Sequence, residues 1–128
     1  MDAITILKIL SDQTRLRILN LLKEDSLCVG EIQTLLDIKQ PNASKHLEKL
    51  KLYELILSKK KAQWVYYQIN LEKFEKYKFL KDLLFSDIKR EEIFNIDISR
   101  LKKYKNSDLC CQDLKNVGFK FDNIKFNT

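Results

Sequence analysis

The chain has 128 residues, of which 45% are hydrophobic and 33% are charged, with a formal net charge of +6. This length predicts one core of ordinary size, and only two Gly and one Pro favour helices over a many-turned β fold. No apolar stretch approaches the roughly 20 residues that span a bilayer, and the N-terminus lacks a signal-type cleavage pattern. We therefore expect a cytoplasmic protein without membrane contact, in which the three Cys are thiols or thiolates.

The predicted elements follow the order of a winged helix-turn-helix. Asp12 is expected to cap one helix, Pro41 fits the first turn of another, and Asn70 is expected to cap a long one. The pattern predicts helices over 3–10, 13–23, 29–36, 40–53 and 71–85, and strands over 55–60 and 63–69. The fold class is thus mostly α with a small β-hairpin wing.

The predicted 71–85 helix carries more apolar surface than one helical face can bury. With the apolar residues of 4–10 it could contact a second subunit, although burial in its own core is the alternative. We therefore expect a dimer, with residues 1–85 as the DNA-binding and dimerisation domain. Residues 86–128 form a C-terminal extension, in which 86–95 is expected to be a charged connector, Asp97 to cap a short helix through Tyr104, and the Phe-containing last residues to dock.

The 40–53 helix begins with short polar groups and becomes apolar only later, which suits insertion into a DNA major groove. Between residues 39 and 63 there are seven Lys against two Glu, so this segment holds most of the net charge. The bases would be contacted by Gln40, Asn42 and Ser44, with Ala43 against a thymine methyl group. Phosphates would be contacted by Lys45, Lys49, Lys59, Lys60 and Lys61. For the three consecutive Lys the alternative is a solvated turn.

The roles of three other basic residues are less clearly indicated by the sequence. His46, the only His, is expected to contact the groove or a phosphate, because one His cannot build a zinc site alone. Arg15 and Arg17 could reach the DNA backbone or pair with acidic neighbours.

The chain contains, in this order, the stretches LSDQTRLRILNLL, LCVGEI, QPNASKHLEKLKLYELI and WVYYQI. With these stretches, roughly residues 4–85 resemble the ArsR/SmtB family of metalloregulatory repressors. The resemblance implies a homodimer that binds double-stranded operator DNA, represses, and dissociates when a metal or metalloid binds. It also implies that Gln40, Asn42, Ala43, Ser44, Lys45 and His46 face the groove, and that Lys59, Lys60, Lys61 and Gln63 lie along the phosphates. One departure is the wing turn KKKAQ, which lacks the Gly often found there.

Cysteines are the candidate sensor. The family's Cys-Val-Cys-Asp pattern is half present, since Cys28 matches its first Cys and Gly30 replaces the second, and residues 70–85 hold no His for a zinc-type site. Some arsenic-responsive members are similar in having a Cys pair near the C-terminus, as Cys110 and Cys111 are here, and thiolates select soft ions. Cys28 also stands where a Ser, Thr or Asn would cap the helix starting at Val29, with Glu31 three residues on, as in a capping box. We expect Cys110 and Cys111 to bind arsenite, or a similar thiophilic metalloid, with Cys28 or a partner's Cys as third ligand and without an organic cofactor.

Other interpretations remain open. Cys28 could be an ordinary small core residue. The thiols could form a disulfide in a regulator that answers oxidants, or they could be incidental in a metal-blind regulator. An enzyme, such as a thiol-based reductase, is disfavoured because no second His, Gly-rich phosphate loop or paired apolar carboxylates accompany the thiols.

Overall fold

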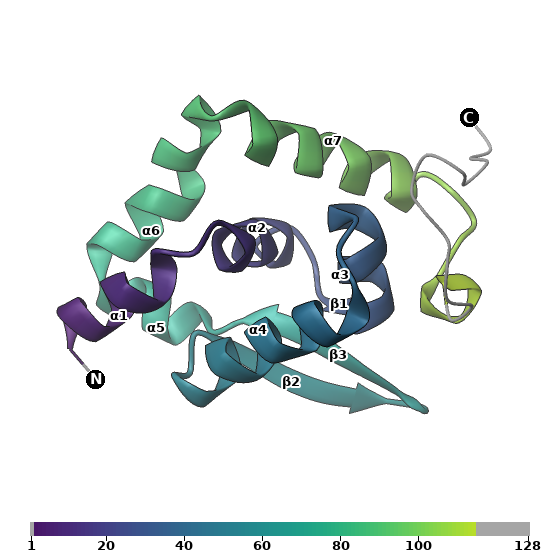
Figure 1. Ribbon diagram of the computed structural model, residues 1–128, viewed down its shortest axis with the longest axis horizontal. Coiled ribbons are helices and arrows are strands. Elements are labelled where there is room, and N and C mark those ends of the chain that lie inside the picture. Colours follow the sequence, from purple (N-terminus) through teal and green to yellow (C-terminus); the bar gives the residue numbers. More distant parts are fainter. Residues whose placement is uncertain (1, 115–128) are drawn as a thin grey trace.

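The computed structural model describes residues 2–114 (Figure 1). The helices are α1 (Ala3–Leu10), α2 (Gln13–Leu22), α3 (Val29–Leu36), α4 (Gln40–Leu52), α5 (Leu71–Lys76), α6 (Lys78–Phe85) and α7 (Glu92–Lys105), with 3-10 turns η1 (Asp87–Arg90) and η2 (Cys111–Leu114). The strands β1 (Leu27–Cys28), β2 (Ile56–Lys61) and β3 (Trp64–Ile69) form one antiparallel sheet in the order β1-β3-β2. The predicted winged helix-turn-helix, mostly helical with a small hairpin, is confirmed, and β1 is an addition to it.

Local capping explains where the first helices begin. The Asp2 carboxylate accepts from the Thr5 backbone N–H at 2.8 Å, and the Asp12 carboxylate accepts from that of Arg15 at 3.0 Å. Each bond satisfies a backbone donor that the first helical turn leaves without an internal partner. The predicted cap at Asp12 is therefore confirmed. The helices within residues 2–114 all fall short of the length and apolar character that a bilayer-spanning helix requires.

Helix α2 lies at the centre of the molecule, with α7 on one side and α4 and the sheet on the other (Figure 1). Its Ile18 and Leu21 are fully buried, as are Ile32 of α3 and Leu47 of α4. Burying such side chains stabilises the fold by about 1.5–3 kcal/mol each. This core fixes the position of α4, whose other side is exposed.

The hairpin of β2 and β3 projects from the sheet. Its register runs from Ile56 opposite Ile69 to Lys61 opposite Trp64, so two residues form the turn. One of them, Ala62, has φ 57°, in the left-handed region that disfavours residues with a Cβ. The turn thus keeps the geometry that a Gly would favour without having one.

Replacing Ala62 with Gly is therefore expected to raise the free energy of unfolding by about 0.5–1 kcal/mol, because the strain relieved exceeds the added freedom of the unfolded chain. Urea denaturation followed by far-UV circular dichroism would measure it. Ala62→Val should instead lower the free energy of unfolding, because a β-branched residue tolerates positive φ poorly. Equal stabilities for both variants would contradict the assignment of strain to this residue.

The predicted single helix over 71–85 is wrong. The chain breaks at Tyr77, whose backbone is extended (φ −118°, ψ 102°). In one straight helix Phe74 and Leu80 would lie about 120° apart around the axis, whereas the break lets both be buried. Asn70 is the N-cap residue of α5, as expected, but its side chain makes no capping hydrogen bond. Its side-chain amide instead donates to the Glu54 carbonyl at 2.9 Å.

The described part of the extension, residues 86–114, holds more regular structure than the sequence predicted. The expected connector at 86–95 contains η1 and the start of α7, with Ile88 and Phe94 buried. Asp97 lies inside α7 rather than at its start, because its carboxylate is buried against Arg17 of α2. The expected docking of the last, Phe-containing residues lies outside the described part of the chain.

Candidate functional site

The start of α4 offers a polar surface beside the wing. Gln40, Lys45 and Lys49 are exposed, and Asn42 and Ser44 are partly exposed. Ala43 and His46, which were also expected to face the DNA, do not belong to this surface, because they are only 0% and 6% exposed. The reason is helical spacing: Ala43, His46 and the apolar residues at 47 and 50 share the inner face of α4. The expectation that Ala43 and His46 face a groove is therefore wrong.

The hairpin continues this polar surface with positive charge. Lys59, Lys60, Lys61 and Gln63 are all exposed at its tip. Within residues 2–114 no ion pair neutralises these lysines or the two on α4. Unpaired ammonium groups at the end of a projecting hairpin are available to phosphates.

His46 instead belongs to a polar cluster between α2 and α4. The Arg15 Nε–H donates to His46 Nδ1 at 3.2 Å, and an Arg15 Nη1–H donates to the Ile9 carbonyl at 2.8 Å. The Asp12 carboxylate lies 4.0 Å from His46 Nε2. Arg15 and His46 therefore connect α1, α2 and α4.

Burial lowers the pKa of His46 below its ordinary value of 6.5, and Arg15, Lys45 and Lys49 lower it further, while Asp12 opposes them. The unfolded chain consequently takes up this proton first as pH falls, so the contribution of His46 to stability is present above pH 6.5 and is lost below it.

The His46→Gln variant tests this, because Gln can still accept from Arg15 but does not titrate. Between about pH 7.5 and about pH 5.5, the wild-type free energy of unfolding should fall more steeply than that of His46→Gln. Urea titrations at several pH values measure both slopes. A wild-type slope no steeper than that of the variant would contradict the assignment.

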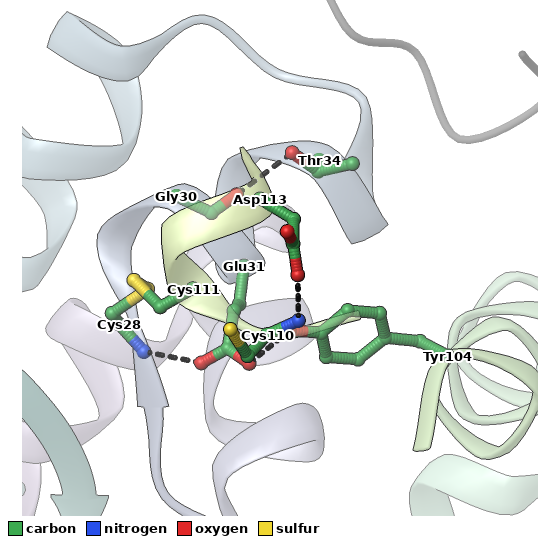
Figure 2. Close-up of a disulfide and its surroundings, with 8 residues drawn as sticks. All are labelled: Cys28, Gly30, Glu31, Thr34, Tyr104, Cys110, Cys111 and Asp113. Atoms are coloured by element: carbon green, nitrogen blue, oxygen red, sulfur yellow. Dashed lines mark hydrogen bonds between the residues drawn. A yellow bond between two sulfur atoms is a disulfide. The ribbon is translucent and has the colours of Figure 1, made fainter. Parts of the chain in front are cut away.

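The three cysteines form a disulfide and one free thiol. Cys28 and Cys111, 83 residues apart, are joined by a disulfide and are 2% and 3% exposed, while Cys110 is an exposed free thiol (Figure 2). The expectation that all three cysteines are thiols is wrong for this structure. The neighbours Cys110 and Cys111 also differ in their surroundings, and the Cys110 backbone N–H donates to the Asp113 carboxylate at 2.7 Å.

A buried carboxylate connects the disulfide to α7 (Figure 2). Glu31 accepts from the Cys28 backbone N–H at 2.9 Å through one oxygen and from the Tyr104 hydroxyl through the other. Burial, together with this hydrogen bond, strongly raises the pKa of Tyr104. The capping signal at residues 28–31 pointed to Glu31, whereas no sequence signal identified Tyr104 as its partner.

The ligand set at this place is mixed. The sulfurs of Cys28 and Cys111 and a Glu31 oxygen lie within 4.8 Å of one another, all from buried residues. With the disulfide reduced, two thiolates and one carboxylate would be present, a set suited to a soft or borderline ion rather than to Mg or Ca.

A cavity of about 430 Å³ separates the disulfide from the wing. It is bordered by both cysteines of the disulfide and by Gln40, the first residue of α4. Its lining consists of Cys28, Val29, Gly30, Gln33, Gln40, Trp64, Val65, Tyr67, Cys111 and Leu114. The disulfide-bonded cysteines and the polar start of α4 therefore border one space.

Comparisons with known proteins agree with this architecture. The family model described as "Bacterial regulatory protein, arsR family" matches residues 12–57. The chain is 44% identical over 68 residues to the arsenical resistance operon repressor of Escherichia coli K12, covering 52% of this chain and 58% of that protein. It is 40% identical over 65 residues to the transcriptional repressor SdpR of Bacillus subtilis 168, covering 51% and 72%.

Among solved structures, the transcriptional regulator HlyU of Vibrio vulnificus is 34% identical, with a TM-score of 0.56, covering 63% of this chain and 82% of that one. Against the first curated relatives, three arsenic-resistance regulators, the match spans only 53–59% of their length. The residues that the family model matches, 12–57, run from the N-cap of α2 into β2.

Proposed function

Because this chain belongs to the ArsR family of bacterial regulatory proteins, we propose that it is a homodimeric transcriptional repressor. It binds double-stranded operator DNA and is released when a thiophilic metalloid, arsenite above all, binds to its cysteine thiolates. The observation that carries the proposal is the meeting of Cys28 and Cys111 beside the polar end of α4.

The exposed side of α4 enters the major groove. Gln40, Asn42 and Ser44 supply short donors and acceptors for base edges, and Lys45 and Lys49 contact flanking phosphates. The wing follows the adjacent backbone with Lys59, Lys60, Lys61 and Gln63. Their exposure and lack of ion pairs among residues 2–114 support these roles.

A second copy covers apolar residues that one protomer leaves exposed. Ile4 and Leu7 of α1 are 65% and 53% exposed, and Phe85 of α6 is 39% exposed. Both helices lie toward the same end of the long axis (Figure 1), away from the hairpin tip. A dimer formed there leaves both copies of α4 free, as a symmetric DNA reader requires.

The reduced cysteines hold the effector. Arsenite, As(OH)₃, exchanges its hydroxyls for thiols, releasing one water for each As–S bond formed. Cys28 and Cys111 are already adjacent, and Cys110 precedes Cys111 in the chain and is exposed. The arsenical-resistance relatives support this choice of effector. No organic cofactor and no catalytic step are part of the proposal.

Effector binding reaches the DNA surface through α3. Cys28 is the N-cap residue of α3, which packs against α4, and Cys111 belongs to η2, which also contacts α3. A metalloid between the two sulfurs holds them farther apart than their direct bond does. A resulting shift of η2 and α3 needs only about 1–3 kcal/mol of coupling to lower operator affinity by about 5- to 150-fold.

A second candidate is favoured by the disulfide itself. In this alternative an oxidant such as hydrogen peroxide converts the thiols of Cys28 and Cys111 into the disulfide and two waters. The oxidised form is then the regulatory signal, and arsenite has no role.

The discriminating experiment is a gel shift of the reduced protein on its own promoter, with arsenite, antimonite, cadmium or peroxide added. We expect arsenite to release the DNA, Cys28→Ser and Cys111→Ser to abolish that release, and Cys110→Ser to weaken it. Normal release from Cys28→Ser and Cys111→Ser would exclude this sulfur site as the sensor.

Two other outcomes have separate meanings. Release by peroxide that a reductant reverses, together with indifference to arsenite, would favour the redox alternative. No binding to the promoter even at low ionic strength would refute the DNA-binding proposal itself.

A further inference from the structure

The cavity beside the disulfide has an apolar lining that inorganic arsenite, which lacks an organic group, would leave without a contact. We infer that this cavity binds the organic group of a trivalent organoarsenical, and that an aryl group fits it better than a methyl group. This inference rests on the proposed function, because the sulfur atoms must first hold the arsenic.

The lining fits a neutral, flat and apolar group. Trp64, Val65 and Tyr67 of β3 border the cavity, Val29 and Leu114 add apolar surface, and no residue of the lining is charged. An engineered apolar cavity of about 150 Å³ suffices for benzene, so a cavity of about 430 Å³ has room for a phenyl ring. Aromatic rings also stack favourably on Trp and Tyr side chains.

The number of sulfur atoms at the cavity matches the ligand. An organoarsenical RAs(OH)₂ has two exchangeable hydroxyls and one arsenic–carbon bond that stays intact. Cys28 and Cys111 both line the cavity, whereas Cys110 does not and is exposed. Two thiolates therefore complete the arsenic, and its third substituent is the organic group.

The chemistry balances in two steps. A dithiol reductant first cleaves the Cys28–Cys111 disulfide, giving two protein thiols and the oxidised, cyclic reductant. RAs(OH)₂ then condenses with these thiols, forming two As–S bonds and releasing two waters. The R group remains on arsenic, next to the sulfur atoms that line the cavity.

Binding in this place also reaches the DNA-reading helix. Gln40 lines the cavity and is the first residue of α4, so an aryl group contacts both the wing and the end of α4. An aryl arsenical should therefore release the promoter at lower concentration than methyl arsenical does.

The experiment compares phenylarsonous and methylarsonous acid on the reduced full chain, by intact-mass measurement of the adducts and competition with a small dithiol. The small dithiol alone gives the intrinsic phenyl-to-methyl affinity ratio. We expect the phenyl-to-methyl affinity ratio of the protein to exceed that of the small dithiol by about tenfold, because the protein would bury the aromatic ring. In Trp64→Ala the ratio should fall to within about threefold of the reference.

Leu57→Ala is the matched control. Leu57 is a large apolar residue on the same hairpin as Trp64 and is 44% exposed, but it does not line this cavity. Its ratio should equal that of the wild type. Each ratio compares two ligands on the same variant. A substitution that changes the reactivity of the thiols or the stability of the fold therefore affects both affinities equally and leaves the ratio unchanged.

Trp64 provides a readout that needs no variant, because it is the chain's single Trp. Phenylarsonous acid should change its fluorescence, and methylarsonous acid should change it less. A protein ratio equal to that of the small dithiol, with equal fluorescence responses, would overturn the inference while the proposed function stands. Absence of any arsenical adduct on the reduced protein would refute the proposed effector, and the inference with it.

Discussion

Replacing Arg17 with Met is expected to lower the free energy of unfolding by about 3–5 kcal/mol, because it leaves a buried carboxylate without a cation. Asp97 is 0% exposed, and it accepts from Arg17 Nε at 2.8 Å and Nη2 at 2.9 Å. Arg17 also donates to the Leu36 carbonyl at 3.3 Å. Urea denaturation at pH 7 would measure the loss, which should accompany weaker docking of α7 on α2.

Two controls define this prediction. Arg17→Met combined with Asp97→Leu should recover most of the loss, because an apolar pair leaves no buried charge. Lys78→Met removes one partner of the exposed Lys78–Asp82 pair and should change stability by less than about 1 kcal/mol. A loss in Arg17→Met as small as that of Lys78→Met would mean that α7 does not depend on this ion pair.

Replacing Lys59, Lys60 and Lys61 together with Gln is expected to weaken operator binding by at least about 100-fold at moderate salt. A homodimer would lose six phosphate contacts, so the slope of log affinity against log salt should become shallower by about 5. Fluorescence anisotropy over a salt series would measure both quantities. Sequence preference should persist, since Asn42 and Ser44 of α4 are unchanged.

The matched control removes the same charge elsewhere. Lys76, Lys89 and Lys102 are exposed and lie on α5, η1 and α7. Their replacement with Gln should change the salt slope much less. If both triple variants weakened binding equally, overall charge rather than the wing would account for the affinity.

The sequence predicted elements whose signals are local. Asp12 capped its helix as expected, and the apolar spacing placed α3 and α4 within a residue or so of their ends. The sequence did not predict the break at Tyr77, because the break depends on the burial of both Phe74 and Leu80. That burial is a tertiary requirement, which the local sequence pattern does not reveal. The place of Asp97 was missed for the same reason, since its partner Arg17 is 80 residues away.

The sites were predicted unevenly. The polar start of α4 and the basic wing follow from composition, but which polar residues face inward depends on the core, as Ala43 and His46 show. Adjacency in sequence suggested that Cys110 and Cys111 act as a pair. The structure instead joins Cys111 to Cys28, because α7 carries the chain from α2 to the start of α3, where Tyr104 meets Glu31.

The covalent link between residues 28 and 111 makes the oxidised chain a ring that contains the whole of α4 and the hairpin. A closed ring of that size has far fewer unfolded arrangements than an open chain, so oxidation should slow the exposure of those segments to proteases and chaperones. The reduced chain would then be degraded faster than the oxidised one, so the amount of this protein in a cell would depend on the redox state of Cys28 and Cys111.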